Sequence, residues 1–202
     1  MTHQAMRRLF ILCCCIWALL ACDNKNATPK ANFVNTDITG SDIGRDFKLT
    51  DHTGQVRTLA DYRGKVVALF FGFAQCPDIC PTTLSDLAQL KQQLGADGDK
   101  LQVLFITLDP ERDTQEVLAG FVPAFDPSFV ALRGSRAEID QVVKDFKIFA
   151  QKVPNKDGAG YTIDHTAATY IFDTQGRIRL FVRHGQTQSL AADVKQLLPP
   201  SR

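Results

Sequence analysis

Residues 66–81 read VVALFFGFAQCPDICP, and most of the fold can be worked out from this stretch. Its first half, from Val66 to Phe73, is an unbroken apolar run with the length of a strand buried on both faces. The segment that follows, Thr82 to Leu94, carries leucines at helical spacing. The sequence therefore predicts a buried strand that passes through two cysteines into a helix.

The two cysteines, Cys76 and Cys80, lie where this strand gives way to the helix. The first turn of a helix offers unpaired N–H groups and a positive dipole end, and both favour a thiolate over a thiol. If the segment is helical, positions four apart share one face. The two sulfurs could then close a disulfide or bind one soft metal ion, such as Cu(I) or Zn(II).

The first 21 residues are typical of an export signal. Arg7 and Arg8 precede an apolar stretch of 13 residues, Leu9 to Ala21, which is short for a bilayer span. The sequence Leu19-Leu20-Ala21-Cys22 resembles a bacterial lipobox, so residues 1–21 are predicted to be a lipoprotein-type signal peptide and Cys22 the lipidated residue. An uncleaved anchor and an ordinary cleaved signal remain alternatives. Each version places the domain outside the cytoplasm, and the lipoprotein version places it on the periplasmic side of the inner membrane.

Polar residues follow, and residues 22–41 are predicted to be the lipid anchor site and a flexible tether. Residues 42–202 are predicted to form one domain, which fits a chain of 202 residues that is 45% apolar. The formal net charge is +1, so nothing indicates a surface for nucleic acid.

Of the six cysteines, three lie in the signal and one is the lipidation site, which leaves Cys76 and Cys80 in the domain. A purely structural disulfide is the plain alternative in an oxidising compartment. A bridge over so short a loop would stabilise the domain by only about 2 kcal/mol. We therefore expect the pair to serve a chemical purpose.

The rest of the chain predicts an α/β fold with a mixed central sheet, helices on both faces and an N-terminal hairpin. A strand that ends in paired cysteines heading a helix is typical of a thioredoxin-like fold. The expected elements are a hairpin over Asp46–Leu59, strands over Leu101–Leu108 and Ser128–Leu132, helices after Asp113 or Thr114 and over Ser135–Phe149, a polar loop over Lys152–Tyr161, a hairpin of Thr166–Phe172 with Ile178–Val182, and a helix over Thr187–Leu198.

A metal held by two thiolates needs a third donor, and His165 is the best placed of the four histidines. It precedes a strong strand, in a loop of the kind that builds sites at strand ends. The alternative is a loop histidine paired with Asp164. His52 and His184 are expected to be solvated, and His3 lies in the signal.

Three blocks of the sequence resemble the Sco/SenC family of copper proteins: Cys76-Pro77-Asp78-Ile79-Cys80-Pro81, Asp109-Pro110-Glu111-Arg112-Asp113-Thr114, and Asp164-His165 with the apolar strand after it. The resemblance runs from about Ile43 to Leu198. It implies a thioredoxin-like fold and a copper ion bound by Cys76, Cys80 and His165, with Cu(I) as the expected state and binding of Cu(II) left open. It also implies a role in assembling the copper centre of cytochrome c oxidase, whose copper-site subunit would be the partner. The copper donor is not identified.

Several alternatives stay open. Residue types alone do not separate copper from zinc. The Asp164 carboxylate could orient the His165 ring, or Asp164 could contribute through its backbone only. Asp78 could influence the protonation of the two thiols, or it could be a solvated turn residue. The chain could be a membrane-tethered copper chaperone or a thiol–disulfide oxidoreductase with Cys76 and Cys80 as its redox pair. A thioredoxin-fold peroxidase is a third reading.

Overall fold

A computed structural model of the chain describes residues 32–156, 158 and 160–199. The predicted signal peptide, the lipidation site Cys22 and the first part of the predicted tether lie outside the described residues. Within the described part, no helix is both long enough and apolar enough to cross a bilayer.

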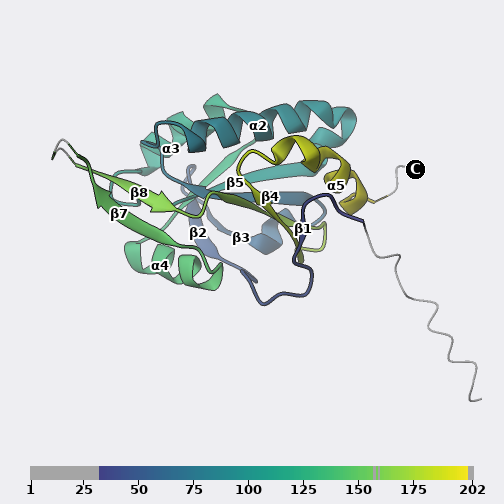
Figure 1. The fold of residues 1–202 in the computed structure, drawn as a ribbon, viewed down its shortest axis with the longest axis horizontal. Coiled ribbons are helices and arrows are strands. Elements are labelled where there is room, and N and C mark those ends of the chain that lie inside the picture. The colour runs from purple at the N-terminus through teal and green to yellow at the C-terminus, as the bar shows by residue number, and fades with distance from the viewer. Residues whose placement is uncertain (1–31, 157, 159, 200–202) are drawn as a thin grey trace, which may run out of the picture. The chain divides into compact units, whose positions relative to one another are not determined.

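The domain is built on an eight-stranded mixed sheet with the order β1-β10-β9-β4-β5-β6-β2-β3 (Figure 1). β4, β5 and β6 run parallel, and every other neighbouring pair is antiparallel. The strands are β1 (Thr36–Asp37), β2 (Lys48–Asp51), β3 (Val56–Thr58), β4 (Val66–Gly72), β5 (Leu101–Thr107), β6 (Val130–Arg133), β9 (Ala168–Phe172) and β10 (Ile178–Arg183). The antiparallel pair of β2 and β3 confirms the predicted N-terminal hairpin.

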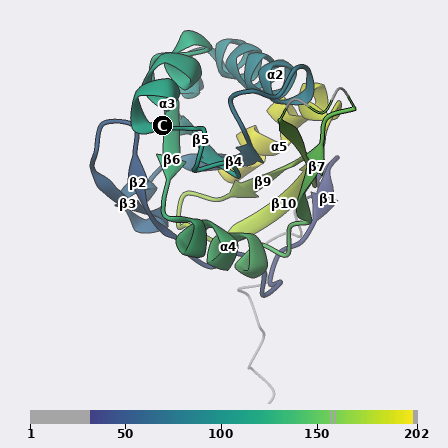
Figure 2. The ribbon, with the colours of Figure 1, turned by 90° about the vertical axis from the view of Figure 1, so that its left-hand side faces the viewer.

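The apolar runs occupy the centre of this sheet. Every residue of β4 and β5 is buried. Helices α2 (Ile79–Gln93) and α5 (Leu190–Leu197) lie on one face of the sheet, and α4 (Arg136–Asp145) lies on the other (Figures 1 and 2). A strand covered on both sides gains nothing from alternating polar residues, which explains the unbroken apolar sequence. The predicted mixed sheet with helices on both faces is confirmed.

Helix α2 begins at Ile79, three residues earlier than the leucine spacing predicted. Cys80 therefore lies inside the first helical turn, whereas Cys76 precedes it. Pro81 is tolerated there because the first N–H groups of a helix have no partner within the helix. The first cysteine thus lies in the loop before α2, and the second lies at the N-terminus of the helix.

The predicted loop over Lys152–Tyr161 is too long, because both of its ends belong to strands and only residues 155–160 connect them. Strands β7 (Ala150–Pro154) and β8 (Tyr161–His165) form a separate antiparallel hairpin, and α4 ends at Asp145 rather than at Phe149. All five residues of β7 are exposed, so the strand has no apolar alternation that could reveal it. His165 accordingly lies at the end of a strand and not in a loop.

The domain also begins earlier than residue 42. Thr36–Asp37 pairs with β10 as an edge strand, and the unit that contains it starts at Phe33. The backbone N–H groups of Val34 and Asn35 donate to the buried carboxylate of Asp193 in α5. The last part of the predicted tether is therefore a component of the folded domain.

Candidate metal centre

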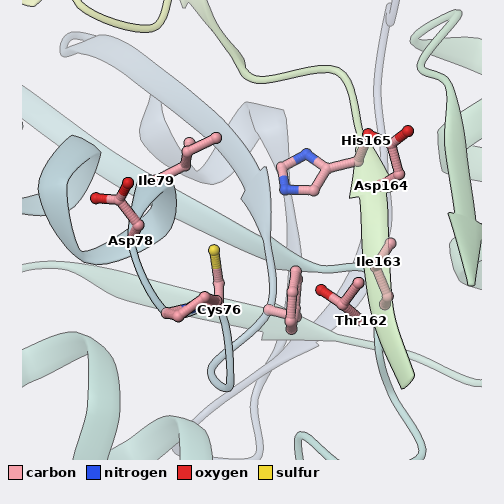
Figure 3. A pocket seen from close by; sticks show the side chains of 9 residues that line it. Cys76, Asp78, Ile79, Thr162, Ile163, Asp164 and His165 are labelled. Carbon is pink, nitrogen blue, oxygen red and sulfur yellow. The ribbon is translucent and has the colours of Figure 1, made fainter. Parts of the chain in front are cut away.

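An open pocket of about 240 Å³ lies between the carboxyl end of β4 and strand β8. One side is formed by the turn that follows β4 and by the start of α2, and the other by Thr162–His165 (Figure 3). The half-buried sulfur of Cys76 and the ring of His165 point into the pocket. Two of the three predicted ligands, 89 positions apart in the sequence, therefore meet at one cavity.

Cys80 lies deeper than Cys76 and is fully buried. Its Sγ is 4.0 Å from Nε2 of His165. It packs so closely on β4 that a Cβ added to Gly72 would stand 2.6 Å from this sulfur. The strand end thus needs glycine at position 72 to make room for the second cysteine.

The His165 ring is held from three directions. The rings of Phe70 and Phe73 contact it edge-on, with centroids 6.4 and 6.1 Å away. Its Nδ1 lies 3.1 Å from the carbonyl oxygen of Thr166. A carbonyl oxygen only accepts, so Nδ1 carries a proton and donates it to this bond, and Nε2 is the ring nitrogen that faces Cys80.

The carbonyl of Thr166 is the acceptor for the His165 ring, a role for which Asp164 was one of two predicted alternatives. The carboxylates of Asp164 and Asp78 both point away from the pocket centre (Figure 3). Neighbouring residues in a strand face opposite sides, so Asp164 and His165 cannot share a face of β8. Sequence reasoning missed Thr166 because a backbone acceptor leaves no trace in residue type.

The two thiols interact through a hydrogen bond that moves their pKa values in opposite directions. A hydrogen bond from Cys80 lowers the pKa of Cys76 to about 5, assisted by the backbone N–H groups of Asp78 and Cys80 and by the charge of His165. The same hydrogen bond and burial raise the pKa of Cys80. Cys76 is therefore the thiolate, and Cys80 remains a thiol.

These donors fit a soft metal ion. Metal–sulfur and metal–imidazole bonds of about 2.3 and 2.0 Å, as found for zinc, sum to about 4.3 Å. The 4.0 Å between Cys80 Sγ and His165 Nε2 lies within that reach. Nevertheless, no set of three or more His, Cys, Asp and Glu side chains in the described residues already converges closely enough to hold a metal. A three-ligand site would require movement of at least one side chain, and Cys76 faces open space.

The block from Asp109 to Thr114 packs next to the site and hydrogen-bonds to the turn that carries Cys76. The Thr114 hydroxyl accepts from Val117 N–H and caps α3 (Gln115–Phe121), as predicted. Asp113, fully buried, accepts from the Thr107 hydroxyl at 2.5 Å and from the Ala74 N–H at 3.0 Å. Burial raises the pKa of Asp113. Its carboxyl group ties the turn that carries Cys76 to the end of β5, a role that the sequence did not reveal.

Fold and site together define a thioredoxin-like protein with a cysteine pair at a helix start and a histidine opposite. Residues 35–199 match the family model described as SCO1/SenC. The chain belongs to the SCO1/SenC family, which confirms the family predicted from its motifs.

Known relatives agree with this assignment. The human mitochondrial SCO1 homolog is 34% identical over 163 residues, which cover 79% of this chain and 54% of the relative. The chain spans about half the length of the mitochondrial relatives it matches.

Solved structures share the fold. Copper-bound ScoI from Bradyrhizobium japonicum is 39% identical, with a TM-score of 0.70 over 77% of this chain and 99% of that one. A second structure is that of BsSco, described as a member of the Sco family of cytochrome c oxidase assembly proteins with a disulfide switch. It is 21% identical, with a TM-score of 0.60 over 81% of this chain and 96% of that one. At this identity it supports the fold alone.

Proposed function

We propose that this chain is a copper carrier that binds one Cu(I) ion through Cys76, Cys80 and His165 and delivers it to the copper site of cytochrome c oxidase. The observation that carries the proposal is the approach of the Cys80 sulfur to within 4.0 Å of His165 Nε2, beside the thiolate of Cys76. Two thiolates and an imidazole suit Cu(I). The copper-bound relative at 39% identity favours copper over zinc.

Each ligand has a distinct task in this proposal. Cys76 is already a thiolate and half-exposed, so it can meet an arriving ion first. Cys80 must release its proton when the ion binds, which makes binding weaker as the pH falls. His165 offers Nε2 as its ligand atom, because its Nδ1–H is committed to the Thr166 carbonyl. The open pocket leaves the cargo accessible to a partner.

A Cu(I) titration tests the proposal. In the absence of oxygen, the reduced protein competes with a chromophoric chelator for Cu(I). The competition is run with wild type and with His165→Ala, Cys76→Ser and Cys80→Ser. Wild type should hold one equivalent, and each variant should bind at least tenfold more weakly. His184→Ala is a matched control, since His184 bonds to Thr83 outside the pocket. A His165→Ala protein that binds as tightly as wild type would refute the three-ligand site.

The second function is that of a thiol–disulfide reductant for the cysteines of the copper-accepting subunit. An accessible thiolate next to a buried thiol is the arrangement that this reaction needs. Cys76 attacks the partner disulfide and forms a mixed disulfide; Cys80 then attacks Cys76. The partner gains two electrons, one proton from Cys80 and one proton from solvent, and this chain becomes a disulfide. This activity should survive His165→Ala and disappear in Cys76→Ser; turnover that persists in Cys76→Ser would exclude it.

We also propose that Cys22 is lipidated and holds the domain on the periplasmic side of the bacterial inner membrane. The support is the pattern of residues 1–22: a basic pair, a short apolar stretch and a cysteine. Metabolic labelling with palmitate should mark wild type and not Cys22→Ser. Label retained in Cys22→Ser would contradict lipidation at this residue.

A further inference from the structure

The hairpin that carries His165 is not part of the main sheet. β7 and β8 pair only with each other within the described residues, and β7 is exposed along its whole length. A two-stranded ribbon is marginally stable by itself in water. Contacts outside the hairpin must therefore decide where β8, and with it His165, stands.

Three interactions converge on Tyr161, the first residue of β8. Its hydroxyl donates to Asp109 Oδ1 at 2.8 Å. Its backbone carbonyl accepts from Arg112 Nη1 at 2.9 Å. The Arg112 guanidinium also stacks over the ring, with its carbon 3.8 Å from the ring centroid. We name Asp109, Arg112 and Tyr161 the tyrosine latch.

The latch is anchored in the core. Asp109 is fully buried and forms an ion pair with Arg112. Charge-assisted hydrogen bonds to a buried carboxylate are stronger than neutral ones. The block after β5 therefore offers a rigid support for the start of β8.

The latch reaches His165 by two routes. Tyr161 and His165 are four residues apart on one strand, so their side chains lie on the same face of β8. The Arg112 guanidinium also stands 6.0 Å from the ring centroid of Phe73, the ring whose edge contacts His165. Contacts that hold Tyr161 and Arg112 in place therefore also hold strand β8 and the Phe73 ring that packs against His165.

We propose that the tyrosine latch is a positioning device that sets the approach of His165 Nε2 to Cys80 Sγ and thereby the affinity of the site for Cu(I). The inference rests on the proposed copper-carrier function. Asp109, Arg112 and Tyr161 act through His165 and do not bind the ion. Releasing the latch lets β8 sample positions in which the third donor is withdrawn.

Tyr161→Phe tests this, because it removes one hydroxyl and keeps the ring under Arg112. We expect Cu(I) affinity to fall roughly 3- to 10-fold, the effect of one hydrogen bond. Amide hydrogen exchange in the metal-free protein should accelerate by a similar factor over residues 161–165 and stay unchanged in α2. Arg112→Lys, which keeps the charge but loses the planar donor geometry, should act in the same direction.

Tyr170→Phe is the matched control. Its hydroxyl is also hydrogen-bonded, to the Phe146 carbonyl at 3.0 Å, but it has no contact with the latch. It should lower the melting temperature without changing Cu(I) affinity. An unchanged Cu(I) affinity in Tyr161→Phe would overturn the latch, whatever the exchange rates.

The double variant Tyr161→Phe/His165→Ala separates positioning from general loosening. If the latch acts through His165, Tyr161→Phe should have no further effect on affinity once His165 is absent. A full additional loss in the double variant contradicts the proposal. His165→Ala alone, if it bound like wild type, would instead refute the copper-carrier function, so the two failures are distinguishable.

Discussion

Gly72 shows how one residue can set the depth of a functional sulfur. At the end of β4 a Cβ would meet Cys80 Sγ at 2.6 Å and a ring carbon of Phe105 at 2.9 Å. Both neighbours are fully buried, so neither can move aside cheaply. The absence of a side chain at this position is what allows the second cysteine to sit against the sheet.

Gly72→Ala should therefore lower the free energy of unfolding by about 1–3 kcal/mol, the usual cost of overpacking, and weaken Cu(I) binding. Chemical denaturation and the chelator competition measure the two effects. Gly120→Ala in α3 is the control, because an added Cβ there meets nothing within 4 Å. It should raise stability by up to about 1 kcal/mol. Equal stability of the two variants would contradict the packing argument.

The ionisation of Cys76 is a second property of a single residue. Its pKa, lowered to about 5 mainly by the hydrogen bond from Cys80, means that the thiolate persists from neutral pH down to about pH 5 and is protonated below that. Alkylation by iodoacetamide, followed by mass spectrometry, should show a midpoint near pH 5 for Cys76. Cys80, buried and protonated, should react far more slowly.

Cys80→Ala provides the control for that titration. Removing the donor should move the Cys76 midpoint upward, towards the value of about 8.5 of an ordinary cysteine. A wild-type midpoint near that ordinary value would show that the Cys80 hydrogen bond is not formed in solution.

At the scale of elements, one buried carboxylate fastens the segment that precedes the N-terminal strand β1. Asp193 accepts hydrogen bonds from the Val34 and Asn35 backbone N–H groups and from Asn35 Nδ2, at 2.8 to 2.9 Å. Three donors and a buried charge make this the contact that joins the segment before β1 to α5. The segment therefore enters the domain at a defined point.

Asp193→Asn should lower the free energy of unfolding by about 1.5–3 kcal/mol, because it weakens charged hydrogen bonds and places N–H groups against N–H groups. It should leave Cu(I) affinity unchanged, since α5 lines no part of the pocket. Asp99→Asn, the same change at an exposed residue, should alter stability by less than about 0.5 kcal/mol. Similar losses in both variants would argue against the Asp193 contact.

At the scale of the whole molecule, metal binding should stabilise the fold. Under the copper-carrier proposal, free Cu(I) at about 100 times its dissociation constant adds about 2.7 kcal/mol. For a domain of this size that is a rise in melting temperature of roughly 5–10 °C. Scanning calorimetry of metal-free and loaded protein measures it. His165→Ala at the same free copper should show a smaller rise, and an equal rise would argue against His165 as a ligand.

Much of the fold could be predicted from the sequence because the central strands have a distinct apolar pattern. β4 and β5 are buried on both faces and therefore apolar throughout. The leucines of α2 and the cap at Thr114 were equally readable, since helical spacing and capping are local. The hairpin of β7 and β8 was missed for the opposite reason: an exposed strand carries no hydrophobic period.

The sequence by itself determined the family through its motifs, and it predicted Cys76, Cys80 and His165 as the candidate ligands from residue type, spacing and the family resemblance. Only the tertiary structure decided how these groups meet: Cys80 buried beneath Cys76, and His165 on a strand with its Nδ1 bound to the Thr166 carbonyl. It alone showed that Asp164 faces away and that Tyr161 contacts Arg112 and Asp109. These contacts join segments far apart in the chain and depend on backbone atoms and direction, which no sequence pattern encodes.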